Sequence, residues 1–201
     1  MIVGVTGGVG SGKSEFCAAL AAEGAAVIDA DLVGRKIVRN NKTVKKLIRN
    51  RFGKQMFDCF GRLRRRRLGR LVFSDPDQLS ALNQIIQPFL VRKIREQIQL
   101  LLHSDPDRLI VLDMAILFES GMLTDIDKVL VITAPEKNRI HWLKASRGWT
   151  EKEILDRIGS QIPTEEKIKM ADLIIENSGS LEALAEKAPR FYRQYNKTQS
   201  N

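Results

Sequence analysis

The residues best suited to chemistry lie near the N-terminus, in a loop that matches G-x-x-x-x-G-K-[ST] at every fixed position. The loop runs Gly7-Gly8-Val9-Gly10-Ser11-Gly12-Lys13-Ser14. Glycines let backbone N–H groups approach phosphate oxygens closely, and the start of a following helix adds partial positive charge. Lys13 can reach the β- and γ-phosphates of ATP, and the Ser14 hydroxyl can ligate Mg²⁺. We expect ATP to contact Gly8, Val9, Gly10, Ser11, Gly12, Lys13 and Ser14. The alternative is a glycine-rich turn that matches by chance, but an apolar run precedes the loop and a helical pattern follows it.

Two acidic sites follow apolar runs, where strands of a parallel sheet would end. Asp29-Ala30-Asp31 comes after the first of these runs, and Asp113 ends the run Leu109-Ile110-Val111-Leu112. Ligands in open α/β sheets bind beyond the carboxyl ends of the strands. We expect Asp31 to accept the proton of an attacking hydroxyl, with helix capping as the alternative role for this acidic pair. Asp113 is expected to hold Mg²⁺, directly or through water.

Arginines form two groups that could face phosphates. Arg139 and Arg147 lie in a helical stretch where a lid would close over the site, and mobile arginines often stabilise a transferring phosphoryl group. A solvent-exposed helix face is the alternative for either residue. A denser cluster contains Arg62, Arg64, Arg65, Arg66, Arg67 and Arg70. This cluster suits a binding wall for a diphosphate substrate, with Arg65 as a substrate contact. Nucleic-acid binding is less well supported, because no aromatic residues are interleaved and no nucleic-acid motif accompanies the cluster.

The basic residues are concentrated in the first half of the chain. The 201 residues carry a net charge of +9, and the window from Arg35 to Arg70 alone carries +14. That balance favours a polyanionic partner, either a phosphorylated small molecule or nucleic acid. The two cysteines, Cys17 and Cys59, support neither a disulfide framework nor a zinc site, so we expect a reducing cytoplasm. No apolar stretch is long enough to span a membrane, and the N-terminus lacks the features of a secretory signal.

Short apolar runs alternate with helical patterns along the chain, which indicates an α/β fold with a parallel sheet. Five strands are expected, at Ile2 to Thr6, Ala25 to Asp29, Leu109 to Asp113, Lys128 to Thr133 and Leu173 to Glu176. Both faces of these strands are expected to be covered. We expect a single domain whose core comprises 1–30, 106–135 and 171–195. A helical substrate-binding lobe would occupy about 31–105, where Pro88 is expected to kink or interrupt a helix, and a lid would occupy about 136–170.

These motifs resemble the dephospho-CoA kinase family over nearly the whole chain, from Ile2 to about Tyr195. The shared pieces are Val5 to Ser14, Val27 to Asp31, Val72-Phe73-Ser74-Asp75, Asp113 with Leu117-Phe118-Glu119, Arg157-Ile158 with Gln161, and Ala171-Asp172 with Asn177. Many kinases share the phosphate loop. The D-A-D and L-F-E sequences, in this order and spacing, are far more specific.

The resemblance implies a P-loop NTPase fold with a five-stranded parallel sheet, a CoA-binding lobe and a lid. It implies that ATP phosphorylates the ribose 3′-hydroxyl of dephospho-CoA in the last step of coenzyme A synthesis. On this pattern Asp31 accepts the hydroxyl proton, while Lys13 and Arg139 stabilise the transferring phosphoryl. Asp113 and Arg65 also match the acceptor side of the site. Arg147 approximates a second lid arginine that contacts ATP, and Asn177 lies where the nucleotide-base pocket is expected.

The sequence departs from the family pattern mainly in the lobe and the lid. Phe60 replaces the aspartate of the family's Asp-Gly pair, and Arg64 replaces the aspartate of its Leu-Asp-Arg sequence. Gln87 replaces the histidine of its His-Pro pair, and Ala115 replaces a proline that precedes L-F-E. The segment after Arg139 is also longer than usual. These changes concern acceptor affinity and lid contacts more than ATP binding.

Two other functions remain compatible with the sequence. The first is a P-loop kinase for another small molecule, such as a nucleoside or nucleotide, which a panel of acceptors would identify. The second is a nucleotide-gated nucleic-acid-binding protein that uses the arginine cluster, which predicts strongly salt-dependent binding of DNA or RNA. We expect ATP and dephospho-CoA as partners, Mg²⁺ as the cofactor, no nucleic acid, no membrane, and a monomer or weak homo-oligomer.

Overall fold

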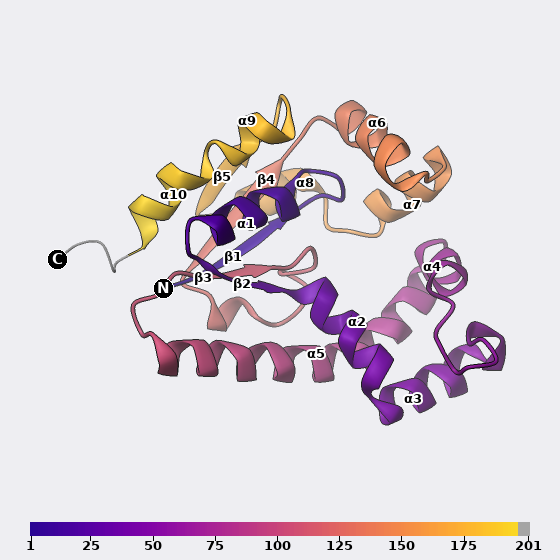
Figure 1. Ribbon diagram of the computed structural model, residues 1–201. Coiled ribbons are helices and arrows are strands. Elements are labelled where there is room, and N and C mark those ends of the chain that lie inside the picture. Colours follow the sequence, from indigo (N-terminus) through magenta and orange to yellow (C-terminus); the bar gives the residue numbers. More distant parts are fainter. Residues whose placement is uncertain (197–201) are drawn as a thin grey trace.

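A five-stranded parallel sheet forms the centre of the computed structural model, which describes residues 1–196 (Figure 1). Its strands are β1 (Ile2–Gly7), β2 (Ala26–Asp29), β3 (Ile110–Asp113), β4 (Lys128–Thr133) and β5 (Leu173–Glu176). They lie in the order β2-β3-β1-β4-β5, with β1 at the centre. All pairings are parallel, so the carboxyl ends of the strands meet at one edge. The α/β fold and all five strands are therefore confirmed.

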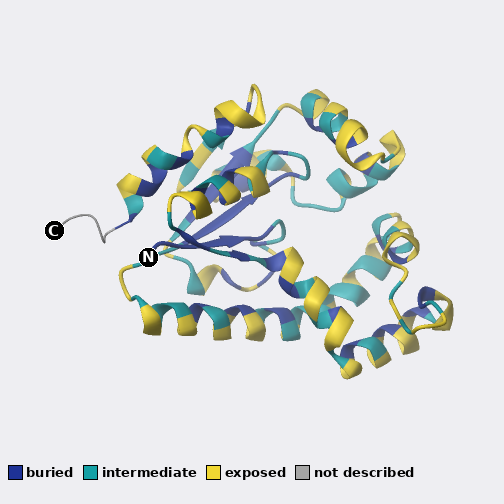
Figure 2. Ribbon diagram, viewed as in Figure 1, coloured by how far each residue is buried: buried dark blue, intermediate teal, exposed yellow. Residues whose placement is uncertain are grey.

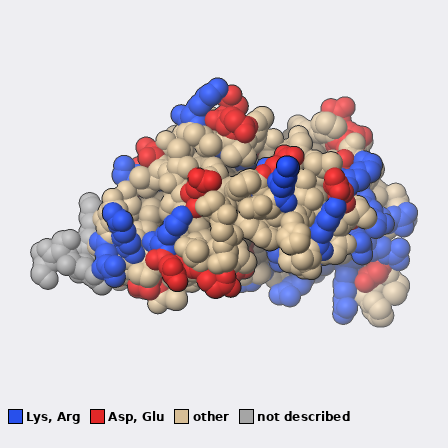
Figure 3. All heavy atoms as spheres, turned by 90° about the horizontal axis from the view of Figure 1, so that it is seen from above, with Lys and Arg blue, Asp and Glu red and all other residues tan. Residues whose placement is uncertain are grey.

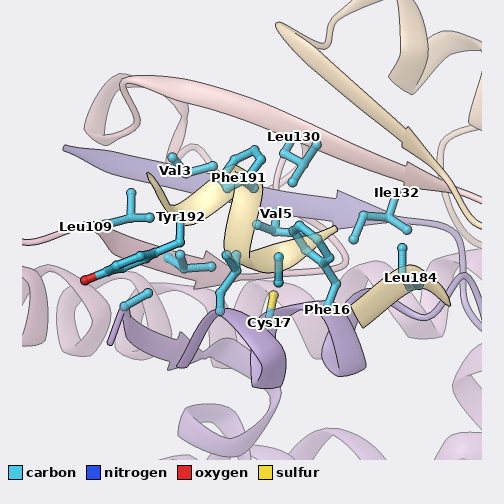
Figure 4. Close-up of a cluster of buried hydrophobic side chains, with 14 residues drawn as sticks. Val3, Val5, Phe16, Cys17, Leu109, Leu130, Ile132, Leu184, Phe191 and Tyr192 are labelled. Carbon is cyan, nitrogen blue, oxygen red and sulfur yellow. The ribbon is translucent and has the colours of Figure 1, made fainter. Parts of the chain in front are cut away.

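Helices cover both faces of this sheet. On one face, α1 (Lys13–Ala22), α9 (Leu181–Ala185) and α10 (Ala188–Tyr195) pack over the strands. Figure 4 shows their apolar cluster, in which Phe16 meets Phe191 edge to face with ring centroids 5.7 Å apart. Cys17 lies in the same cluster as a buried packing residue. A second cluster, from the opposite face, includes Leu90, Ile94 and Ile98 of a long helix.

That long helix belongs to a four-helix region, which follows β2. Its elements are α2 (Ala30–Asn40), α3 (Lys42–Phe52), the short 3-10 helix η1 (Lys54–Met56), α4 (Arg65–Phe73) and α5 (Pro76–Ser104). This region has an apolar core of its own, built around Val44, Ile48 and Leu68. The helix α5 begins after the capping residue Asp75 and continues through Pro88 without interruption. Proline removes one backbone hydrogen bond, and burial of the apolar face of α5 offsets that loss.

The α6–α8 segment lies between β4 and β5. It comprises α6 (Glu136–Arg147), α7 (Glu151–Gly159) and α8 (Thr164–Lys169), and another short 3-10 helix, η2 (Leu123–Asp125), lies before β4. A capping box opens α7, because Thr150 and Glu153 exchange hydrogen bonds between side chain and backbone. The helix α7 contacts α4 of the four-helix region, so the two regions meet beyond the carboxyl ends of the strands, on the right in Figure 1.

One expectation about the sheet was wrong. Apolar composition had indicated strands covered on both faces, but burial alternates along β5, and Ile174 is 52% exposed. The strand β5 lies at the edge of the sheet, where one face is left open. The other strands are largely buried, which Figure 2 shows as dark blue at the centre with exposed residues on the outer helix faces.

Basic side chains gather at one end of the molecule. Figure 3 shows lysine and arginine crowded at the right-hand end, the end at which α3, α4 and α7 lie in Figure 1. Within residues 1–196, no helix is long and apolar enough to cross a membrane. The two histidines, His103 and His141, are both exposed.

Candidate active site

The phosphate loop connects β1 to α1 at the carboxyl edge of the sheet. Gly12 precedes α1 in the left-handed region, with φ 90° and ψ 6°, so the chain can turn from the loop into the helix. Two distant side chains hold the loop: Asn177 donates from Nδ2 to the Ser11 carbonyl at 3.0 Å, and the Val9 N–H donates to Gln161 Oε1 at 3.2 Å. The expected ATP-binding loop is therefore held by one residue directly after β5 and one from the α6–α8 segment.

Lys13, Ser14 and Asp113 form one connected cluster beneath this loop. The Lys13 ammonium makes an ion pair with Asp113 Oδ1, and the Ser14 hydroxyl donates to Asp113 Oδ2 at 2.9 Å. Asp113 is only 5% exposed, and its partners lie about 100 residues away in the chain. Burial alone would lower the pKa of Lys13, but the carboxylate of Asp113 raises it above the ordinary value, so the lysine remains charged.

Asp29 and Asp31 take different positions at the start of α2. Asp29 lies beside Asp113 in the sheet register and caps α2, because its Oδ1 accepts the Leu32 N–H at 2.8 Å. Asp31 lies in the first turn, exposed, and accepts no hydrogen bond from residues 1–196. Its charge nevertheless contributes to raising the pKa of Lys13. The capping role considered for this pair thus falls to Asp29, while Asp31 is close enough to Lys13 for its charge to act on it.

The two arginines of α6, Arg139 and Arg147, differ sharply in their surroundings. Arg139 is 6% exposed, and a Cβ atom added at Gly8 would collide with its Nη1 atom, so the guanidinium lies against the phosphate loop. Burial lowers the pKa of Arg139, although Glu136 and Glu165 act in the opposite direction. Its Nε atom has no hydrogen-bond partner among the residues described. Arg147 lies exposed in the last turn of α6, which leaves its expected contact with ATP a prediction.

The four-helix region and the α6–α8 segment are joined by side-chain contacts between α4 and α7. The guanidinium of Arg157 lies 4.2 Å from the ring centroid of Phe73 and 4.1 Å from that of Trp149. Nearby, Arg70 Nε lies 3.0 Å from Glu153 Oε1. Stacking of a cation between two aromatic rings contributes more to the contact between α4 and α7 than the exposed ion pair does.

Most of the arginine cluster lies in or directly before α4. Arg64, Arg65, Arg66, Arg67 and Arg70 line a cavity of about 640 Å³. Their side chains are exposed, so a ligand can reach them. The structure therefore collects these five arginines around one cavity, and whether Arg65 contacts a substrate remains a prediction.

Sequence reasoning missed two residues that the structure brings to this edge of the sheet. Sequence reasoning identified Gln161 only as part of a motif shared with the family, although its side-chain oxygen accepts a hydrogen bond from the phosphate loop. Lys167 was not noticed at all, yet its side chain is 0% exposed and close enough to Lys13 and Arg139 for their charges to affect its pKa. A lysine in a short, charged helix gives no local signal that it is buried.

Gly12 offers a direct test of the loop geometry. A Cβ atom there would lie 2.7 Å from Leu184 Cδ2 and 2.8 Å from Asn177 Nδ2, at a φ that favours glycine. We expect Gly12→Ala to lower the free energy of unfolding by about 1–3 kcal/mol and to weaken ATP binding, measured by thermal melting and ATP titration. Gly34→Ala is the matched control, because nothing lies within 4 Å of its Cβ position in α2. That change should stabilise the protein by about 0.5–1 kcal/mol. Equal effects of the two substitutions would contradict the loop geometry.

Comparison with known proteins gives a consistent result along the chain. The family model described as dephospho-CoA kinase matches residues 1–183. The dephospho-CoA kinase of Carboxydothermus hydrogenoformans is 39% identical over 185 residues, which cover 92% of this chain and 89% of that protein. Among solved structures, a Thermus thermophilus protein called TT1252 has a TM-score of 0.76 and 34% identity, with 96% of this chain and 97% of that chain covered. The dephospho-CoA kinase from Campylobacter jejuni has a TM-score of 0.69 and 26% identity, with 98% of both chains covered.

Both kinds of similarity extend over the sheet, the four-helix region and the α6–α8 segment rather than over the phosphate loop alone. A likeness confined to the loop would be shared with many unrelated kinases. The chain belongs to the dephospho-CoA kinase family.

Proposed function

We propose that this chain transfers the γ-phosphoryl group of ATP to the ribose 3′-hydroxyl of dephospho-CoA, giving ADP and coenzyme A. The observation that carries the proposal is the convergence of Lys13, Ser14 and Asp113, with Asp31 near enough to act on the same lysine, in a chain of this family. A phosphate-binding loop with a carboxylate facing it is the arrangement that phosphoryl transfer to a hydroxyl requires.

In this mechanism the ribose hydroxyl oxygen forms a bond to the γ-phosphorus as the bond to the β–γ bridging oxygen breaks. Asp31 accepts the proton of the hydroxyl, which makes the oxygen a better nucleophile. Lys13 and Arg139 stabilise the negative charge that spreads over the transferring group, because both are desolvated and positively charged. Asn177 supports this role by fixing the loop through the Ser11 carbonyl, and a contact between Asn177 and the adenine remains part of the proposal.

Ser14 and Asp113 fit a magnesium site. Their oxygens already lie 2.9 Å apart, and hydroxyl and carboxylate oxygens are ligands that Mg²⁺ prefers. Mg²⁺ commonly takes few protein ligands and completes its shell with phosphates and water, so two protein oxygens are enough to hold it. When bound, the metal would neutralise charge on the phosphates.

The four-helix region would bind the acceptor, and the α6–α8 segment would close as a lid. The cavity on α4 suits the diphosphate of dephospho-CoA, with Arg65 among its contacts, because five guanidinium groups surround it. Phe60, which stands where the family has an aspartate, is 78% exposed, so it supplies a surface for stacking rather than a charge. We propose that the reaction takes place in the cytoplasm, since both cysteines are free thiols.

Loss of the Arg157 contact should impair closure of the lid. Arg157 of α7 stacks on Phe73 of α4 and on Trp149, which precedes α7, so Arg157→Ala removes the stacking contact between the two regions and the contact with Trp149 that supports it. We expect KM for dephospho-CoA to rise about 5- to 30-fold, from a loss of about 1–2 kcal/mol, in steady-state kinetics. Arg92→Ala is the control, because Arg92 stacks on Phe89 of its own helix at 5.9 Å and joins no two regions. An unchanged KM in Arg157→Ala would refute closure through this contact.

The direct test is to mix the protein with Mg·ATP and dephospho-CoA and to follow coenzyme A by mass spectrometry. Adenosine, AMP and ADP should be offered as competing acceptors under the same conditions. We expect coenzyme A to form and the other acceptors to react far more slowly. Phosphorylation of a nucleoside or nucleotide in place of dephospho-CoA would contradict the proposal and favour a different small-molecule kinase.

A further inference from the structure

Lys167 is a buried charge that the mechanism above does not use. It lies in α8, with a side chain that is 0% exposed, and its Nζ atom donates to the Ala115 carbonyl at 3.2 Å. Within residues 1–196 no carboxylate oxygen lies within 4.0 Å of this ammonium, although the charge of Glu119 acts on it from farther away. Desolvation of an ammonium costs free energy that one carbonyl contact does not recover. The buried charge of Lys167 therefore lowers the stability of the folded protein, which suggests that the site uses it.

The acceptor of this hydrogen bond has a second donor. Thr6 Oγ1 in β1 also donates to the Ala115 carbonyl, at 3.1 Å. A carbonyl oxygen has two lone pairs, so Thr6 alone would leave it satisfied. If the Lys167 ammonium were removed, the Ala115 carbonyl would still accept a hydrogen bond from Thr6. The fold therefore does not need the Lys167 bond to satisfy this carbonyl.

The segment that Lys167 holds, residues 114–119, runs from the phosphate side of the site to the four-helix region. It starts directly after Asp113, which pairs with Lys13 and Ser14. It ends at Glu119, whose carbonyl accepts the Gln87 amide of α5 at 2.8 Å. A shift of this segment would therefore move Asp113 relative to the region that we assign to the acceptor.

Three positively charged side chains lie close together at this edge of the sheet, with few carboxylates to balance their charge. Lys13 is paired with Asp113, while Arg139 has only Glu136 at 3.8 Å and Lys167 has no paired carboxylate within the described residues. Burial lowers the pKa of Lys167, and Lys13 and Arg139 lower it further, whereas Glu119 opposes them. A polyphosphate bound at the loop would compensate this excess of positive charge.

We propose that Lys167 is a positioning residue for phosphoryl transfer. It ties α8, at the end of the α6–α8 segment, to residues 114–119, and so fixes Asp113 and the acceptor side of the cleft relative to the phosphate loop when the site is closed. Because its side chain is fully buried, it acts through the Ala115 carbonyl and through its charge rather than by touching the acceptor. This inference rests on the proposed function, since it concerns the same cleft and the same reaction.

Lys167→Met tests the proposal, because methionine has a similar length and carries no charge. We expect kcat to fall about 10²-fold, the effect typical of a small misplacement of reacting groups, while the Kd for ATP changes less than about threefold. The melting temperature should stay within about 3 °C of the wild type or rise, because a buried charge is removed. Lys169→Met is the matched control: Lys169 is exposed, pairs with Glu166 at 2.7 Å, and should leave all three quantities unchanged.

The outcomes are distinguishable. A fall in kcat with an intact fold and intact ATP binding supports positioning by Lys167. A kcat within about threefold of the wild type overturns it. Failure of Lys167→Met to fold, or a melting temperature lowered by more than about 5 °C, also overturns it, because the ammonium would then serve the fold. Absence of coenzyme A formation by the wild-type protein in the same assay would instead count against the proposed function.

Discussion

Asp31→Asn is expected to lower kcat by about 10²- to 10⁴-fold, which is the range associated with loss of a general base. Asparagine has nearly the same shape as aspartate but cannot accept the proton of the ribose hydroxyl. Asp31 accepts no hydrogen bond from residues 1–196 and does not cap α2, so the substitution should leave the fold intact. Binding of ATP should change by less than about threefold, since the phosphate loop is untouched. Rapid-quench measurement of coenzyme A formation, with ATP titration of the same preparation, checks both expectations.

Asp29→Asn is the matched control for that experiment. Asp29 lies two residues away and accepts the Leu32 N–H at 2.8 Å, and asparagine caps helices about as well as aspartate. We therefore expect at most a few-fold loss of kcat, with a melting temperature near that of the wild type. A severe loss in Asp29→Asn together with near-normal turnover in Asp31→Asn would transfer the role of base to Asp29.

Lys13→Ala is expected to reduce kcat by about 10²- to 10³-fold, because the site loses a desolvated positive charge aimed at the transferring phosphoryl. The same change should lower the free energy of unfolding by about 1–3 kcal/mol, since it leaves the buried carboxylate of Asp113 with only the Ser14 hydroxyl. The two effects separate in the measurement: chemical denaturation without nucleotide reports stability, and single-turnover kinetics on the folded protein report chemistry.

Lys93→Ala provides the comparison for an ordinary surface lysine. Lys93 pairs with Glu96 at 2.9 Å, but its side chain is 52% exposed, so solvent screens the pair and it adds little to stability. No change in turnover is expected. The double variant Lys13→Ala with Asp113→Asn should recover part of the stability without recovering activity, because no carboxylate charge would remain unpaired. Undiminished turnover in Lys13→Ala would refute its role in stabilising the phosphoryl group.

Local chemistry made most of the fold and the phosphate loop predictable. Short apolar runs such as Ile110–Asp113 are typical of strands buried between two layers of helices. The glycines before Lys13 allow the backbone to turn from the loop into a helix. Capping signals fixed where α5 and α7 begin, at Asp75 and Thr150. All of these signals act over a few residues, so they are present in the sequence itself.

The tertiary structure decided which distant residues meet. Ser11 is held by Asn177, 166 residues away, and Val9 meets Gln161 across 152 residues. Burial of Lys167 beside Ala115, and the exposed face of β5 at the edge of the sheet, likewise depend on how elements pack. Sequence pattern determines the period and the ends of each element, because backbone sterics and short-range hydrogen bonds set them. Partners brought together by packing carry no local signal, so only the folded chain shows that a lysine in a short, charged helix lies buried behind a phosphate-binding loop.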